Sequence, residues 1–417
     1  MDDIKYSFGI GDRFGMQGLA QLKAFKRCEE CGVIVVPVWN KSHREHTLTG
    51  TSPGDVRTEA DEAAKALGWK HPYHIDADHI TMKTADAFLE SSDFFTIDVA
   101  DRINTASGEE QMQDFITRNE KFTGTLPVPG MNTPVKVTGT FLEETARKFL
   151  NATEEAGRIY KKITDGRKGK DFLAEVSMDE TDRPQSPGEL FFILGELAHR
   201  GVRINSIAPK FTGSFHKGVD YSGDPQAFAR EFEQDLIILE FAREEFGLPH
   251  NLKISVHSGS DKFSIYPAIR KLIRKHHSGL HLKTAGTTWL EELTGLIQTG
   301  GPGLTFARNL YAESLIRKDE LLAPYRSVTD IDFKKLPSQA TVNSWEGEPF
   351  ARAVRHDPSD SVFNPDLRQF LHLSYKLAAE RMKEFRELVM ARSEVIEARV
   401  TDNLFLRHMK PLFIDPV

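Results

Sequence analysis

The sequence predicts an α/β protein folded as a (β/α)8 TIM barrel, with an insertion after the fourth strand and a helical C-terminal extension. Two observations predict this class. Short β-branched or aromatic runs alternate eight times with longer segments of helical period before residue 300, and ionisable residues gather where those runs end. Open doubly wound sheets usually hold about five to seven parallel strands, whereas eight βα units close into a barrel in ~250 residues. A barrel is therefore the more economical interpretation.

The eight expected strands share β-branched and aromatic residues bounded by turn residues. They lie at 4–10, 32–39, 72–79, 93–100, 171–180, 202–211, 252–261 and 279–286. Helices are expected between them, from about 17, at 60–67, 84–91, 144–163, 186–200 and 224–247, and from about 264 and 287. The helix with the clearest signals has Ser186 as N-cap, Pro187 at its first position, Glu189 completing a capping box and Gly201 just past its end.

The chain divides into a barrel at 1–300 and an extension at 301–417. Residues 104–143 interrupt the alternation and are rich in Pro, Gly and Thr, so we expect an inserted hairpin or loop there. Residues 301–417 are charged and helical in period, and we expect them to pack on the barrel rather than add a ninth repeat.

Composition and charge exclude several classes of protein. With 39% hydrophobic and 28% charged residues, the chain is typical of a soluble globular protein and has no apolar run near the roughly 18 residues of a membrane span. A formal net charge of −7 argues against general affinity for nucleic acid or anionic membranes. The acidic start lacks a secretory apolar segment, which indicates the cytoplasm. Any anionic substrate must therefore meet a local basic pocket.

Two short motifs are weighed and set aside. Cys28 and Cys31 form one CxxC with no second pair at matching spacing, so reduced thiols are favoured over a zinc site. Gly9, Gly11 and Gly15 have the spacing G-x-G-x-x-x-G, while a dinucleotide site requires G-x-G-x-x-G and an acidic residue ending the second strand, which here ends in Val-Trp-Asn. A sharp turn at the barrel rim explains these glycines better.

Polar residues at the expected strand ends predict one catalytic pocket, because strand C-termini meet at one face of a barrel. His79, His257 and His281 are predicted metal ligands, and such nitrogens with a carboxylate suit Zn, Mn, Co or Ni. Each histidine alone is equally well explained as a hydrogen-bonded residue lining the barrel; three in one pocket favour a metal. The carboxylates that complete the site or act as bases are Asp76, Asp78 and Glu175.

Basic residues at the same ends predict an anion pocket. Arg13, Lys210, Lys262 and Lys283 suit a substrate carboxylate through charge-assisted hydrogen bonds, or else they neutralise the nearby acids. Both roles are compatible. Further predicted substrate-binding residues from the strand-end motifs are Asp12, Asp179, Ser258 and Asp261.

These same segments resemble a known family. FGIGDRFG, DADHITMKTADAF, FFTIDVAD, EVSMDETDRPQSP, KFTGSFHKGVDYSGD, VHSGSDKFSIYPA, LHLKTAGTTWLE and RQFLHLSY are similar to motifs of the tagaturonate epimerase family, some of whose members are tagatose 4-epimerases. The resemblance implies a metal-dependent barrel enzyme that interconverts D-tagaturonate and D-fructuronate in hexuronate breakdown, with His79, His257 and His281 as ligands. Family members carry a further N-terminal segment before the first strand, and the 104–143 insertion has no clear match.

Such an epimerisation restricts the mechanism. The inverted carbon, C4, lies two bonds from the C2 ketone, so enolisation does not acidify its hydrogen. Transient oxidation needs a nicotinamide, and the glycine spacing disfavours one; retro-aldol cleavage of C3–C4 and re-addition is our hypothesis. Glu175 or Asp78 would take the C4 hydroxyl proton, and Lys283 or Lys210 would steady charge or hold the substrate carboxylate. A metal-dependent aldolase and a non-catalytic sugar-acid-binding barrel are the alternatives, and a homo-oligomer is compatible with each.

Overall fold

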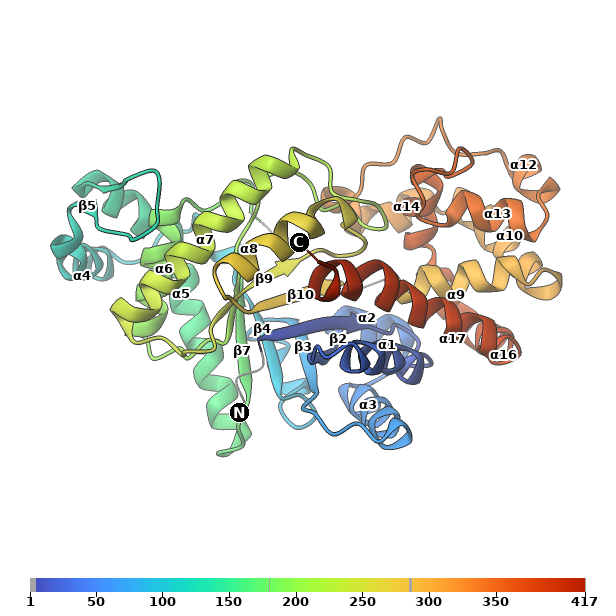
Figure 1. Ribbon diagram of the computed structural model, residues 1–417, viewed down its shortest axis with the longest axis horizontal. Coiled ribbons are helices and arrows are strands. Elements are labelled where there is room, and N and C mark those ends of the chain that lie inside the picture. Colours follow the sequence, from blue (N-terminus) through green and yellow to red (C-terminus); the bar gives the residue numbers. More distant parts are fainter. Residues whose placement is uncertain (1–4, 180, 285–286, 417) are drawn as a thin grey trace.

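The protein folds around a closed barrel of eight parallel strands, as the sequence predicts. The computed structural model describes residues 5–179, 181–284 and 287–416, and the barrel order is β1-β10-β9-β8-β7-β4-β3-β2 (Figure 1). The predicted strand ends at residues 180 and 285–286 lie outside the described residues. The strands are β1 (Tyr6–Gly11), β2 (Val35–Ser42), β3 (His74–Ile80), β4 (Phe94–Asp98), β7 (Leu173–Ser177), β8 (Ser206–Ala208), β9 (Lys253–His257) and β10 (Leu280–Thr284).

Helices follow the strands around the barrel. The predicted capping box of α6 is confirmed, since Ser186 and Glu189 bond each other's backbone and Pro187 starts the helix. A seven-residue helix that the periodicity missed, α2, begins at His43, and its N-cap Ser42 forms a capping box with Glu45. The helices associated with the barrel are α1 (Gly18–Glu30), α2 (His43–Thr49), α3 (Pro53–Leu67), α5 (Gly139–Arg167), α6 (Pro187–His199), α7 (Pro225–Phe246), α8 (Tyr266–Lys275) and α9 (Thr287–Gln298).

Two connections differ from the expected helices. After β3 the chain makes only a single 3-10 turn, η1 (Ala85–Ala87), where a short helix is predicted. The insertion does contain a hairpin, β5 (Gly124–Leu126) with β6 (Val135–Val137), and a helix before it, α4 (Glu109–Asn119). Because Thr138 caps α5, this helix starts within the predicted insertion and extends over 29 residues.

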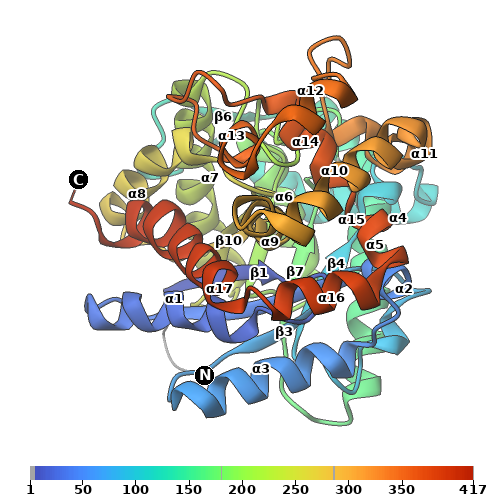
Figure 2. The same cartoon turned by 90° about the vertical axis from the view of Figure 1, so that its right-hand side faces the viewer.

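The C-terminal extension is helical and reaches two parts of the barrel. Helices α10, α12, α13 and α14 lie at the right of Figure 1, and α17 with η6 runs back along α1 (Figure 2). Within the described residues no helix is both long and apolar enough to cross a membrane. The extension comprises α10 (Gly301–Ile316), α11 (Lys318–Leu322), η5 (Ala323–Val328), α12 (Gln339–Ser344), α13 (Gly347–Val354), α14 (Pro365–Leu373), α15 (Tyr375–Glu380), α16 (Met382–Met390), α17 (Ser393–Asp402) and η6 (Asn403–Ile414).

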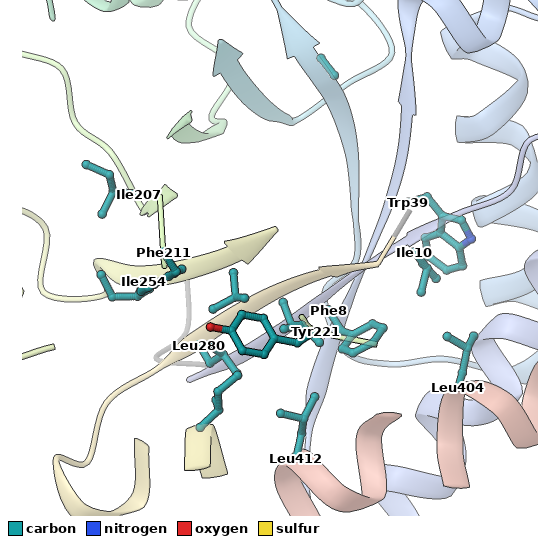
Figure 3. Packing of buried hydrophobic residues seen from close by; sticks show 14 of the residues in the cluster. Phe8, Ile10, Trp39, Ile207, Phe211, Tyr221, Ile254, Leu280, Leu404 and Leu412 are labelled. Atoms are coloured by element: carbon teal, nitrogen blue, oxygen red, sulfur yellow. The ribbon is translucent and has the colours of Figure 1, made fainter. Parts of the chain in front are cut away.

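The barrel has an apolar outer layer, and its interior changes from apolar to charged toward the C-terminal ends of the strands. Phe8 and Ile10 of β1 point outward and pack against the C-terminal segment, where Leu404 and Leu412 lie (Figure 3). Inside, Val36, Val38, Phe94 and Leu173 form a small separate apolar cluster. Ionisable side chains follow it toward the strand C-termini, so the fold concentrates charge at one end of the barrel.

Candidate active site

A buried lysine lies at the centre of the charged end. Lys283, on β10, has its Nζ 2.7 Å from Asp76 Oδ2, 2.6 Å from Asp78 Oδ1 and 4.0 Å from Glu175 Oε1. It also donates to Thr96 Oγ1 at 2.7 Å. Burial alone lowers the pKa of the ammonium, but Asp76 and Asp78 outweigh burial and raise that pKa above its usual value. Lys283 is therefore a permanent cation that links the carboxylates of β3, Asp76 and Asp78, with Glu175 of β7.

The carboxylates around Lys283 respond differently to burial. Burial raises the pKa of Asp78, but Lys283 beside it more than offsets this and brings the pKa to about 2. For Asp76, burial dominates and Asp78 and Glu175 add like charge, so its pKa rises to about 6 despite Lys283. Asp78 is thus ionised, while Asp76 is the member of the pair that most readily takes a proton.

Glu175 and His257 form a second pair deep in the barrel. His257 Nε2 lies 2.6 Å from Glu175 Oε1, and Ser206 donates to Glu175 Oε2 at 2.7 Å. Burial disfavours the imidazolium, but the charges of Asp179 and Glu175 prevail and raise the pKa of His257 to about 10. With both oxygens engaged, Glu175 orients His257 and is poorly placed to reach a ligand at the mouth.

A backbone irregularity turns His79 toward the same place. Asp76 and Asp78 alternate inward on β3, so His79 would face outward in a regular strand. The register with β4 shifts between Ala77 and Ile80, and His79 has φ of 50°. Its ring consequently lies 5.2 Å from the ring of His257, and its Nδ1 is 3.3 Å from Asp98 Oδ2. A strained, non-glycine φ at such a position is characteristic of functional sites.

His79, His257 and Asp179 form a group able to bind a metal ion. One ligand atom from each lies within 4.8 Å of the others. Asp179 Oδ1 is 3.3 Å from His257 Nδ1 and accepts a bond from Ser177. Each imidazole has its other nitrogen against a carboxylate, Asp98 or Glu175, which is the usual way proteins orient metal-binding histidines. Two nitrogens and one oxygen suit Zn, Mn, Co or Ni, so these residues fit the divalent ion that the family resemblance implies.

His281 is separated from that group. It faces the barrel interior two residues before Lys283, and its Nδ1 lies 2.9 Å from Ser7 Oγ. Its ring packs on Phe94, and burial lowers its pKa to about 3. The structure therefore brings two of the three predicted histidine ligands together, adds Asp179, and leaves His281 one pleat deeper as a neutral residue.

Asp12 and Arg13 have distinct positions after β1. The Asp12 carboxylate accepts the backbone N–H groups of residues 14–17 at 2.5 to 3.0 Å, so it shapes the turn into α1 rather than facing a ligand. Arg13 donates through Nε to Glu45 at 2.9 Å and lies over the Tyr375 ring at 3.9 Å. Arg13 thus lies at the mouth with the Nε side of its guanidinium group fixed by Glu45.

The predicted binding residues after β9 are engaged inside the protein. Ser258 donates to the backbone oxygen of Lys283 at 2.8 Å. Lys262 is fully buried and donates to the carbonyls of His216 and Val219, and burial lowers its pKa to about 7. These contacts shape the loop, and neither side chain is directed to a ligand.

Asp261 is the centre of a separate buried group, the Asp261 cluster, that joins this loop to the extension. Its partners are Arg368 at 2.8 Å, His356 at 2.9 Å and His408 at 3.1 Å. Arg368 and the hydrogen bonds from both imidazoles outweigh burial and hold the pKa of Asp261 well below its usual value. Asp261 therefore anchors the loop to α14, to η6 and to the segment that follows α13.

Two further residues border the mouth. Lys210, predicted as catalytic, is half-buried after β8, and no carboxylate in the described part of the chain pairs with it. Asn40 of β2, which the sequence reasoning did not select, is buried beside Gly9 with neither amide atom hydrogen-bonded to any described residue. Its only signal in the sequence is its place at a strand end.

Comparisons with known proteins agree with this fold. The family described as UxaE, tagaturonate epimerase, matches residues 1–410. A Thermotoga maritima protein named tagaturonate/fructuronate epimerase is 30% identical over 389 residues, which cover 89% of this chain and 73% of that protein. Two crystal structures of fructuronate-tagaturonate epimerase UxaE from Cohnella laeviribosi superpose with TM-scores of 0.82 and 0.80 at 26% and 27% identity, covering 100% and 98% of this chain and 83% and 81% of theirs.

The fold and these comparisons define an enzyme of the isomerase class, an epimerase built on a (β/α)8 barrel. The chain belongs to the UxaE tagaturonate epimerase family. The family resemblance drawn from the strand-end motifs is confirmed.

Proposed function

We propose that the protein interconverts D-tagaturonate and D-fructuronate by inverting C4, with a divalent metal ion held by His79, His257 and Asp179. The observation that carries the proposal is the meeting of this group with the Lys283 carboxylates at one barrel mouth, in a chain of this family. A divalent ion there supplies Lewis acidity for negative charge that develops on substrate oxygens.

The protein's own groups support cleavage and re-addition. Asp78 is ionised, lies at the mouth end of β3 and is the carboxylate we assign to take the C4 hydroxyl proton. As the C3–C4 bond breaks, its electron pair moves toward C2 and the C2 oxygen gains charge, while C4 becomes an aldehyde carbon. Rotation about the bond to that aldehyde and reversal of the same steps, with the proton returned from Asp78, gives the epimer.

Lys283 holds the charge of this step in place. Its Nζ lies between Asp76 and Asp78. When Asp78 gains the proton it loses its negative charge, so the positive charge of Lys283 is less neutralised and stabilises negative charge on the substrate more strongly. Asp76, whose pKa is raised, is a second site for that proton through the shared lysine.

One isotope experiment tests the mechanism. Purified protein supplied with Zn²⁺, Mn²⁺, Co²⁺ or Ni²⁺ is incubated with D-tagaturonate in deuterated water without NAD, and products are followed by NMR. Cleavage and re-addition predicts D-fructuronate with no deuterium at C4. Deuterium at C4 contradicts that route, deuterium at C3 indicates a protonated enolate, and two released fragments indicate an aldolase instead.

A further inference from the structure

The side of the barrel mouth that carries Arg13, here called the basic side, lies apart from the acids around Lys283. The acids Asp76, Asp78, Asp98 and Glu175 lie on the neighbouring strands β3, β4 and β7. In the barrel order, β1 lies opposite β7, and Arg13 follows β1 directly. A substrate with a negative end is therefore favoured with that end toward Arg13 and away from these acids.

On the basic side, Arg13 is held rigidly with one donor unused. Glu45 receives its Nε, and Tyr375 covers its guanidinium plane. Arg13 Nη2 lies 3.2 Å from His372 Nε2, while Nη1 is buried and has no hydrogen-bond partner among the described residues. A buried donor without a partner is costly unless a ligand supplies the acceptor.

His372, from α14 of the extension, presents a second such donor. A guanidinium only donates, so His372 Nε2 must accept from Arg13, and the proton of the neutral ring is on Nδ1. The pKa of His372 lies well below its usual value, first because it is fully buried and then because Arg13 and Lys217 are near. His372 Nδ1 is buried and finds no acceptor in the described part of the chain.

Lys217 adds a positive charge next to these donors. It lies in the loop after β8, half-buried, and its ammonium approaches Gly259, where an added Cβ would be 3.2 Å from Nζ. The neighbouring Gly218 packs against His372 and the backbone of α14. Residues 5–179, 181–284 and 287–416 contain no carboxylate that forms an ion pair with Lys217. The extension and the β8 loop thus bring a second positive charge, besides that of Arg13, close to His372.

We propose that Arg13, Lys217 and His372 form the subsite for the carboxylate of the sugar-acid substrate, and that they set the preference for uronates over neutral ketoses. This inference rests on the proposed function. The arrangement directs the carboxylate end to the basic side and places the keto and hydroxyl carbons against Asp78, Lys283 and the imidazoles. The C-terminal extension is then part of the substrate site through His372.

The test uses unreactive probes that differ only at one end. Binding of D-galactonate and of galactitol is measured by calorimetry on the full chain with divalent metal supplied. Lys217→Met is expected to weaken D-galactonate by about tenfold to a hundredfold, as for a lost charge-assisted hydrogen bond, and to leave galactitol unchanged. Lys217→Arg restores most of the loss. Lys65→Met, on the exposed face of α3, is the matched control and changes neither.

Kinetics separate this inference from the proposed function. In Lys217→Met the KM for D-tagaturonate rises by the same factor, while kcat changes less than threefold. Equal loss for both probes, no loss for either, or a wild type that does not bind D-galactonate overturns the subsite. A wild type that binds D-galactonate selectively through Lys217 but does not turn over D-tagaturonate overturns the proposed function and leaves the subsite standing.

Discussion

The barrel mouth and the Asp261 cluster contain the same residue types but have different roles. Both combine carboxylates, imidazoles and a cation, and both are largely buried. Around Asp261, Arg368, His356 and His408 all bond the one carboxylate, and each is 0–1% exposed. At the mouth, the side chains of His79, Asp98 and Asp179 remain 21–25% exposed. A closed ionic cluster stabilises the fold, whereas one with an open edge is available for chemistry.

The largest effect is expected at the mouth. Asp78→Asn removes the assigned base but keeps its shape, so kcat should fall by about 10²- to 10⁴-fold. Turnover of D-tagaturonate measures the loss, with thermal unfolding and circular dichroism as controls for folding. A kcat within tenfold of the wild type would exclude Asp78 as the base.

At the closed cluster the effect is expected on stability instead. Asp261→Asn leaves buried Arg368 without its anion, which should cost about 3–5 kcal/mol of unfolding free energy. The fraction that stays folded should keep kcat within about threefold, because Asp261 touches no reacting group. Urea unfolding and active-site titration check this, and a variant of wild-type stability would contradict the comparison.

Acid should affect the closed cluster in a defined pH range. The pKa of folded Asp261 lies well below its unfolded value of about 3.9, so its stabilisation is complete above about pH 5 and is lost as the pH falls through and below 4. Because burial lowers the pKa of His356 and Asp261 partly opposes that shift, the comparison is made in a His356→Asn background. There the gap in unfolding free energy between Asp261 and Asn at this position should be larger at pH 5 than at pH 3, and the reverse order has the wrong sign.

Metal binding distinguishes His79, at the mouth, from His281, one pleat deeper in the barrel. Asp98→Asn removes the carboxylate behind His79 and should weaken metal affinity by about 10- to 100-fold. His281→Asn is the matched variant one pleat deeper and should leave affinity unchanged. Competition with a chelator measures both, and a larger loss in the His281 variant would restore it to the ligand set.

The sequence predicts the barrel and most of the mouth because these depend on local patterns. Strand periods count correctly to eight, and strand C-termini converge in any such barrel, which brings Asp78, Glu175, His257 and Lys283 together. Depth inside the barrel depends on the stagger between strands, so His281 looked equivalent to His257. The inward turn of His79 depends on a bulge that no periodicity reveals.

Local sequence patterns do not reveal contacts between the strand ends and distant segments of the chain such as the extension. Asp261 and Lys262 resemble mouth residues in the sequence, but Asp261 binds Arg368, 107 positions later, and Lys262 donates to the backbone of the earlier β8 loop. His372 lies 359 positions from Arg13, and only tertiary packing shows that they meet. Long-range burial therefore decides which strand-end charges face a ligand.

The packing of the last helices on α1 has a consequence for synthesis. Thr401 bonds the backbone of Ala20, and Cys28 contacts Met409, across 381 positions. At roughly 5–20 residues per second, α1 leaves the ribosome well before its partners exist. The apolar surface of β1 and α1 that packs against these last helices therefore stays exposed until translation is nearly finished. During that time chaperones can bind it.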